Sequence, residues 1–158
     1  MIPFNQDFKD LLSSLLAADV RFLLVGAYAL AFHGHPRATK DMDLWVEPTR
    51  DNAARVLRAL TAFGAPIRDV TTDDLADPRT VFQIGVPPRR VDLLCSVEPV
   101  LFDQAWAARE ILRLDDIDVP VIGLKALLAN KEASDRLQDR ADAEIIRGLL
   151  KKSRKTSS

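Results

Sequence analysis

Two aspartates one residue apart, Asp41 and Asp43, stand in a stretch that otherwise reads as an apolar strand, DMDLWVE (41–47). Successive strand side chains point to opposite faces, so both carboxylates share one face, roughly 7 Å apart along the strand. At that spacing they do not hydrogen-bond to each other, but they can converge on one hard cation. Mg²⁺ takes such oxygen ligands and keeps water and substrate phosphates in its remaining positions. On its own the pair favours an edge strand whose Asp side chains face water beside Lys40 and Arg37, because the Asp-x-Asp pattern is common. The features that follow favour a magnesium site instead.

A third carboxylate, Asp92, lies in another predicted strand, residues 90–97. If that strand neighbours the one at 41–47, Asp92 lies about 4.5–5.5 Å, Cβ to Cβ, from one of the pair. Three such carboxylates suit two cations about 3.5–4 Å apart, which clamp the attacking and leaving oxygens in phosphoryl transfer. Asp92 is also a candidate general base for the attacking hydroxyl. The alternative is a hairpin aspartate paired with Arg89 or Arg90.

A candidate phosphate site precedes the two aspartates. Gly26 separates the β-rich run VRFLLV (20–25) from the helix-favouring AYALAFHG. Such a strand-to-helix junction offers backbone N–H groups to a phosphate. The glycine needs no function to explain it, because a strand-to-helix turn favours glycine anyway.

Three further polar residues are candidates for contact with substrate. Arg37 is placed to neutralise a triphosphate, and Thr39 to contact substrate or to orient Asp41. For both, loop capping and charge balance are the alternative. Lys131 interrupts an apolar stripe after Leu128, so it either reaches a phosphate or extends past the core as a surface lysine.

The elements that position these residues alternate between helix and strand, which predicts a mixed β-sheet flanked by helices, an α+β or α/β architecture. Asn5 and Thr49 are predicted helix N-caps, and Gly64 is a predicted helix end. The strands at 80–86 and 90–97 form a predicted antiparallel pair. The remaining expectations are a helix over 6–18, a helix after Thr49, helical sequence at 99–108, a hairpin around Asp115 and Asp116, and a helical pattern from Gly123 to Leu150.

This order of residues resembles the nucleotidyltransferase superfamily of the DNA polymerase β type. The signature is a strand, a Gly-[Gly/Ser] pair opening a helix, Asp-x-[Asp/Glu] on the next strand and a later carboxylate. Here Gly26-Ala27, Asp41-Met42-Asp43 and Asp92 occupy those places. VGAYALAFHGHPRATKDMDLWV is similar, more narrowly, to the small stand-alone branch with abortive-infection nucleotidyltransferases and related toxin–antitoxin proteins.

The C-terminal part extends the likeness to roughly residues 20–147. LKALLANKEASDRLQDRADAEII is similar to the closing helices of that branch, where a lysine and an Arg-x-x-Asp-x-x-Asp run recur. Lys131, Arg136, Asp139 and Asp142 occupy those positions. Without the resemblance, the last three are an ion-pair network on one helix face.

The resemblance implies a nucleotidyltransferase fold and a Mg²⁺- or Mn²⁺-dependent enzyme that moves a nucleoside monophosphate from an NTP to a hydroxyl acceptor. The acceptor is a protein side chain, an RNA 3′ end or a small molecule. A toxin–antitoxin or abortive-infection context, with a helical or DNA-binding partner protein, is implied as well. One departure is Ala27, where the signature has a second glycine or serine. A degenerate nucleotide- or partner-binding module therefore stays open as the alternative.

Composition sets the remaining expectations. The chain has 158 residues, with 22 basic and 23 acidic side chains, so no global field attracts nucleic acid. We expect a single domain over 1–150 and a basic, flexible tail over 151–158. We expect a cytoplasmic protein without a membrane partner. Cys95 is the only cysteine, no apolar run reaches the roughly 18–20 residues of a membrane span, and the N-terminus lacks the basic-then-apolar pattern of a secretory signal. His33 and His35 lack enough further soft ligands for a closed zinc site.

Overall fold

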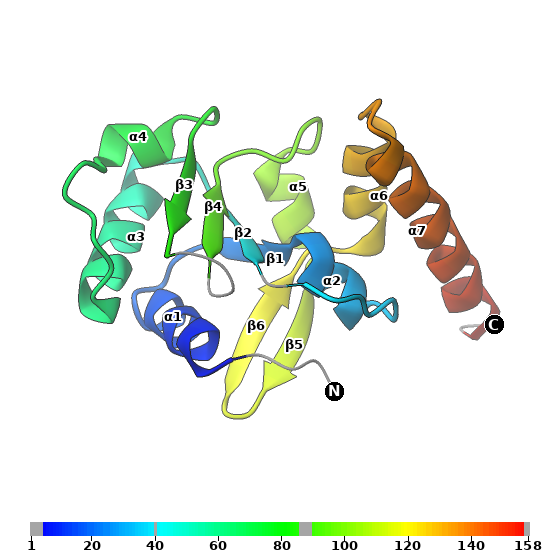
Figure 1. Cartoon of the computed structure of the whole chain (residues 1–158), viewed down its shortest axis with the longest axis horizontal. Helices are drawn as coiled ribbons and strands as arrows, with labels where there is room; N and C mark the ends of the chain where they lie inside the picture. The colour runs from blue at the N-terminus through cyan, green and yellow to red at the C-terminus, as the bar shows by residue number, and fades with distance from the viewer. Residues whose placement is uncertain (1–4, 40, 86–89, 157–158) are drawn as a thin grey trace.

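The computed structural model describes residues 5–39, 41–85 and 90–156, which form a six-stranded mixed sheet with helices packed around it (Figure 1). This confirms the expected α+β architecture. The order of strands across the sheet is β3-β4-β2-β1-β6-β5. The strands are β1 (Phe22–Val25), β2 (Met42–Val46), β3 (Val81–Ile84), β4 (Val91–Leu94), β5 (Glu110–Leu114) and β6 (Ile117–Val121). The helices are α1 (Gln6–Ala17), α2 (Gly26–Phe32), α3 (Arg50–Phe63), α4 (Thr72–Ala76), α5 (Phe102–Ala107), α6 (Leu124–Glu132) and α7 (Leu137–Thr156).

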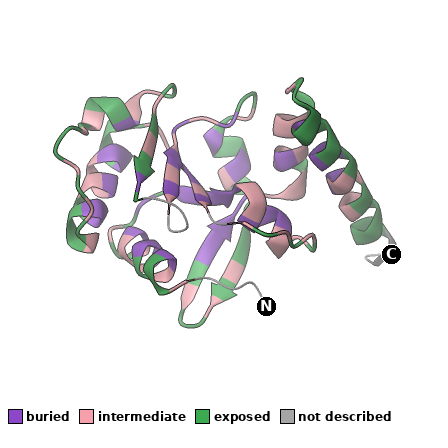
Figure 2. Cartoon of the chain, viewed as in Figure 1, coloured by how far each residue is buried: buried purple, intermediate pink, exposed green. Residues whose placement is uncertain are grey.

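The centre of the sheet is made of β1, β2 and β4. β2 runs antiparallel to β1 and parallel to β4, while the outer pairs β3–β4 and β5–β6 are antiparallel. All four residues of β1 are buried, as expected for a strand covered on both faces. In Figure 2 the buried residues concentrate on these central strands and on the helix faces turned toward them. A rigid, buried centre of this kind fixes the positions of the side chains at the strand ends.

Local sequence explains where the first and third helices begin and end. The Asn5 side chain accepts a hydrogen bond from the Phe8 N–H at 2.8 Å, and the Thr49 side chain caps α3 through the Asn52 N–H. Gly64 ends α3 in the left-handed region with φ 92°. These three predicted helix ends are confirmed, because each depends only on residues within one turn.

Two features of the helices differ from expectation. α4 was not predicted, although Thr71 and Asp74 form a capping box that signals its start. The helical pattern from Gly123 is interrupted between Glu132 and Leu137, where the Ser134 hydroxyl accepts a hydrogen bond from the Arg136 N–H at 3.2 Å. Such local side-chain bonds compete with helical ones, so the sequence forms two helices there.

The C-terminal segment from residue 151 is helical where a flexible tail was expected. α7 continues to Thr156. Lysine and arginine favour helix, and their charges stabilise a helix C-terminus through its dipole, so the basic composition of 151–154 supports the last turns. Residues 157 and 158 lie outside the described part of the chain. Among the helices described, none is long and apolar enough to cross a bilayer.

A buried asparagine, Asn52, ties α3 to the sheet. Its side chain is fully buried; it accepts a hydrogen bond from the Arg21 N–H at 2.8 Å and donates to the carbonyls of Arg21 and Glu47, each at 3.0 Å. Asn52→Ala leaves these backbone groups unpaired, so we expect unfolding free energy to fall by about 2–3 kcal/mol. Urea denaturation measures this, with the exposed Arg58→Ala on the same helix as control. Equal stability of the two variants would contradict the structural role.

Candidate active site

The three predicted carboxylates gather at one end of β2 and β4. Asp43 on β2 is directly paired with Asp92 on β4, and on its other side with Val25, the last residue of β1. Asp41 immediately precedes β2, and Thr39 donates to its backbone carbonyl at 3.1 Å. The expectation that Asp92 neighbours the pair is therefore confirmed by the strand register.

Gly26 brings the backbone against this cluster. It follows Val25 directly, opens α2 and has φ +69°, a region that residues with a Cβ rarely adopt. A Cβ built at this position would collide with the Asp43 Oδ2 atom and would lie 3.2 Å from Asp43 Cγ. Glycine is thus required at position 26 for steric reasons, because a Cβ there would occupy the place of the Asp43 carboxylate. Ala27 follows inside the first turn of α2.

The Asp43 carboxyl is in an unfavourable place for a negative charge. Burial and the charges of Asp92 and Asp41 together raise its pKa to about 6, against the opposing influence of Arg90 and Lys131. Like charges this close disfavour simultaneous ionisation unless a cation offsets them. A nearby positive charge would therefore stabilise the ionised form of the three-aspartate cluster.

Arg90 supplies part of that charge. Its Nη2 atom lies 2.9 Å from Asp41 Oδ2, and its Nε atom lies 3.2 Å from Asp92 Oδ1. The second contact is an ion pair without hydrogen-bond geometry, since both atoms are buried and lack a hydrogen-bond partner. The sequence alternative of an Asp92–Arg90 pair is therefore also observed. What the sequence did not indicate is that the same guanidinium bridges to Asp41.

The donor set fits a hard divalent cation. Asp41 Oδ1 and Asp92 Oδ1 are buried oxygens without a hydrogen-bond partner, and carboxylate oxygens are the ligands that Mg²⁺ and Mn²⁺ accept. In the part of the chain that the structure describes, no three His, Cys, Asp or Glu side chains are already gathered as a metal site. A cation held by Asp41, Asp43 and Asp92 requires these carboxylates to turn toward a common point.

A pocket with a volume of about 380 Å³ opens beside the cluster. Gly26 and Asp43 form part of its wall, and Lys131 and Arg136 bring positive charge to it from the α6–α7 region. The other lining residues are a mixture of apolar and polar groups: Val25, Leu94, Ser96, Val97, Glu98, Leu127 and Asn130. A cavity with a carboxylate at one wall and cations at another suits a phosphorylated ligand with bound metal. The sequence analysis did not identify these seven lining residues as site candidates, because only the fold brings them to one cavity.

The sequence matches no protein-family model and no curated protein. Solved structures do match over most of the chain. One is the lincosamide antibiotic adenylyltransferase LnuA bound to lincomycin, with a TM-score of 0.58 and 13% identity, covering 92% of this chain and 98% of that one. Another is a proposed nucleotidyltransferase from Thermotoga maritima, with a TM-score of 0.54 and 16% identity, covering 92% and 91% of the two chains. The chain has a nucleotidyltransferase fold.

Within this nucleotidyltransferase fold, Lys131 is held by a buried ion-pair network. Its Nζ atom lies 3.0 Å from Asp139 Oδ1 and 3.1 Å from Asp142 Oδ2. Arg136 pairs with Asp139 at 3.0 Å, and Arg37 pairs with Asp142 at 2.7 Å. The network therefore joins α6, α7 and the segment before β2, whereas the sequence alternative placed it on a single helix face.

The network fixes the charge state of its two aspartates. Burial raises the pKa of Asp139, but hydrogen bonds from Ser134, Lys131 and Arg136 outweigh it and bring the pKa to about 2. For Asp142, bonds from Arg37, Lys131 and Gln138 likewise outweigh burial and hold the pKa below its usual range. Both side chains are thus anionic at neutral pH.

This gives a prediction for stability in acid. A depressed pKa in the folded state stabilises the protein above about pH 4, and this stabilisation is lost as pH falls toward 2. For Asp139 we expect a loss of about 1 kcal/mol between pH 5 and pH 3, and Asp139→Asn removes that contribution. Thermal unfolding at both pH values measures it. The exposed Asp135→Asn serves as control; a control and a test variant with identical pH dependence would contradict the assignment.

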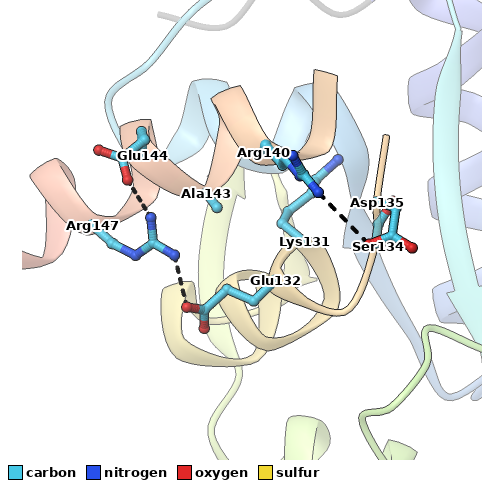
Figure 3. A pocket seen from close by; sticks show the side chains of 8 residues that line it. All are labelled: Lys131, Glu132, Ser134, Asp135, Arg140, Ala143, Glu144 and Arg147. Carbon is cyan, nitrogen blue, oxygen red and sulfur yellow. Dashed lines mark hydrogen bonds and ion pairs between the residues drawn. The ribbon is translucent and has the colours of Figure 1, made fainter. Parts of the chain in front are cut away.

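A second cavity lies on the other side of Lys131, between α6 and α7 (Figure 3). There Arg147 bridges Glu132 at 2.8 Å and Glu144, and Arg140 lies 3.9 Å from Asp135. The opposite charges in this cavity compensate one another. The pair between Arg147 and Glu132 joins α7 to α6, the two helices that carry the Lys131 network.

Two histidines complete the list of sequence candidates. The His33 Nε2 atom lies 2.7 Å from the Ile122 carbonyl, to which it donates, and Nδ1 lies 3.5 Å from Glu110 Oε2. His33 also ends α2. These contacts join α2 to the β5–β6 side of the sheet.

Proposed function

We propose that this protein is an enzyme that transfers a nucleoside monophosphate from an NTP to a hydroxyl acceptor. Asp41, Asp43 and Asp92 are the proposed ligands of Mg²⁺ or Mn²⁺. The observation that carries this proposal is the pairing of Asp43 with Asp92 on adjacent strands, at the wall of a pocket that also contains Lys131. The nucleotidyltransferase fold of the matching structures supports the same reaction class.

The proposed reaction divides the work among a few side chains. The acceptor hydroxyl attacks the α-phosphorus, the bond to the bridging oxygen breaks, and pyrophosphate leaves. Asp92 accepts the hydroxyl proton as the new P–O bond forms. A bound divalent cation supplies charge stabilisation for the phosphate oxygens. Lys131 and the backbone N–H groups of Gly26 and Ala27 are proposed contacts of the triphosphate.

Arg37 and Thr39 have positioning roles in this proposal. Arg37 is engaged by Asp142, and Thr39 by the Asp41 backbone carbonyl. Neither side chain needs to touch the substrate to affect its binding. Arg37 holds Asp142, which pairs with Lys131, and Thr39 holds the backbone at the start of β2. We therefore expect their substitution to raise the KM for NTP more than it lowers kcat.

The matching structures and the sequence resemblance favour different classes of acceptor. LnuA is a lincosamide antibiotic adenylyltransferase, and its similarity to this chain supports a small-molecule acceptor. A toxin–antitoxin or abortive-infection context would instead favour a protein side chain or an RNA 3′ end. In that second context a helical or DNA-binding protein is the proposed partner. Label transfer in a lysate distinguishes these acceptors by their mass.

The test is a labelling assay with the purified protein, α-labelled NTPs, Mg²⁺ and cell lysate. We expect label in an acceptor with the wild-type protein and none with the double variant Asp41→Ala plus Asp43→Ala. A matched control is Asp116→Ala plus Asp118→Ala, which removes an Asp-x-Asp pair from the β5–β6 hairpin, where the side chains are 84% and 59% exposed. Label transfer that survives the first double variant would remove the proposal.

A second candidate function is a nucleotide- or partner-binding module without turnover. Two observations favour it. Ala27 stands where the signature has a second glycine or serine, and Arg90 already pairs with Asp41 and Asp92. Calorimetry separates the two functions. Mg²⁺-dependent NTP binding without product in the labelling assay would favour the binding module.

A further inference from the structure

We infer that Arg90 is a built-in counter-ion that holds Asp41 and Asp92 before a divalent cation binds, and that it thereby sets the cation affinity of this site. The inference rests on the proposed function, because it takes the three aspartates as the cation ligands. It adds a residue with a defined role, which neither the fold nor the sequence signature assigns.

The geometry supports direct competition between Arg90 and a cation. The guanidinium approaches both carboxylates: Asp41 Oδ2 lies at 2.9 Å, and the two oxygens of Asp92 lie at 3.2 and 3.5 Å. A metal ion bound by both residues needs oxygens of the same two carboxylates. Since a guanidinium only donates hydrogen bonds and never loses its proton, its positive charge repels a metal ion that is bound to the same carboxylates. Withdrawal of the guanidinium from at least one aspartate therefore favours cation binding, so Arg90 and the cation compete for these carboxylates.

The present contacts of Arg90 are suited to being exchanged. Its Nε atom and Asp92 Oδ1 are buried but have no well-directed hydrogen bond, and the Nη2–Asp92 Oδ2 distance is 3.5 Å. Asp41 Oδ1 also lacks a hydrogen-bond partner. One guanidinium in contact with two of the three carboxylates thus compensates the cluster incompletely, and a divalent ion offers both more charge and stronger oxygen ligation.

The backbone of Arg90 stays in place during such an exchange. Its carbonyl accepts a hydrogen bond from the Met42 N–H at 3.0 Å, which fixes the start of β4 against β2. Only the side chain, which is 31% exposed, needs to swing outward. The charge of Arg90 then remains at the mouth of the site, where it still repels a cation. Removing this charge should therefore strengthen cation binding.

The experiment measures Mn²⁺ binding by calorimetry without nucleotide, so its readout does not depend on turnover. The proteins are wild type, Arg90→Gln, Arg90→Gln plus Asp43→Asn, and Arg113→Gln. Arg113 is a matched control because it pairs with Asp118 at 2.8 Å on the β5–β6 hairpin. We expect Arg90→Gln to bind Mn²⁺ about tenfold more tightly than wild type, equivalent to about 1.4 kcal/mol. The control should match wild type, and the added Asp43→Asn should abolish the gain.

Each pattern of results has a definite meaning. If wild type binds Mn²⁺ but Arg90→Gln binds equally or more weakly, and the added Asp43→Asn abolishes binding, the counter-ion role is wrong while the metal site stands. If no variant binds Mn²⁺, both the metal site and the counter-ion role are wrong. Binding by Arg90→Gln alone would support the inference in its strongest form. Arg90→Lys, which keeps the charge without the two-pronged geometry, serves if Arg90→Gln does not fold, and it should bind Mn²⁺ more tightly than wild type by a smaller factor.

Discussion

Replacing Gly26 by alanine is expected to reduce the proposed NMP transfer by at least about a hundredfold, because small displacements of reacting groups have effects of this size. The added Cβ would collide with the Asp43 carboxylate, which must then leave its place opposite Asp92. The positive φ of 69° adds strain of about 1–3 kcal/mol for a residue with a side chain. We expect a lower melting temperature and a lower rate together. Label transfer and thermal unfolding measure the two effects.

Gly148→Ala is the matched control for this prediction. A Cβ at Gly148 meets no atom within 4 Å, and the residue lies within α7, where alanine is the better helix former. This variant should keep wild-type transfer and equal or higher stability. If Gly26→Ala transferred label at the rate of Gly148→Ala, the close approach between the turn and Asp43 would have no functional importance.

The contrast between these two glycines shows what sequence can and cannot reveal. Gly26 was singled out because it separates a strand from a helix and begins a known signature. That its missing Cβ makes room for Asp43 follows only from the antiparallel pairing that puts Val25 opposite Asp43. Such a contact joins residues seventeen positions apart, and no local pattern encodes it.

Local patterns did predict most of the elements. The alternation in 41–47, the apolar run before Gly26 and the caps at Asn5 and Thr49 each depend on neighbours within a few residues. The resemblance to nucleotidyltransferases added a third carboxylate on a later strand, in the place of Asp92, whereas neither source predicted α4. Strand order was not available from periodicity alone, since β4 lies beside β2 with two helices and β3 between them in the sequence.

The charged residues were harder to place than the strands. Arg37 looked like a phosphate contact because of its position before Asp41, yet its guanidinium reaches Asp142, 105 residues later. Arg90 was one of two alternative partners of Asp92, with Arg89, and it also reaches Asp41. Long side chains choose among several carboxylates according to the tertiary structure, so sequence spacing limits their partners only weakly.

Asp142→Ala is expected to cause the largest loss of stability. The Asp142 side chain is 3% exposed and accepts from Arg37 at 2.7 Å, from Lys131 at 3.1 Å and from Gln138 at 3.0 Å. Removing one member of a buried charged network leaves its partners without compensation, which costs about 3–5 kcal/mol. For a chain of this length that corresponds to a melting temperature lower by roughly 6–20 °C. Differential scanning calorimetry at pH 7 measures it.

Asp135→Ala is the appropriate control, because its side chain is fully exposed and lies 3.9 Å from its nearest cation, Arg140. Its melting temperature should stay close to that of wild type, since exposed ion pairs contribute little. Asp142→Ala should also weaken NTP binding, because Lys131 loses one of the two carboxylates that hold its ammonium at the pocket wall. A variant that unfolds like the control and binds NTP like wild type would show that the network neither stabilises α6 and α7 nor positions Lys131.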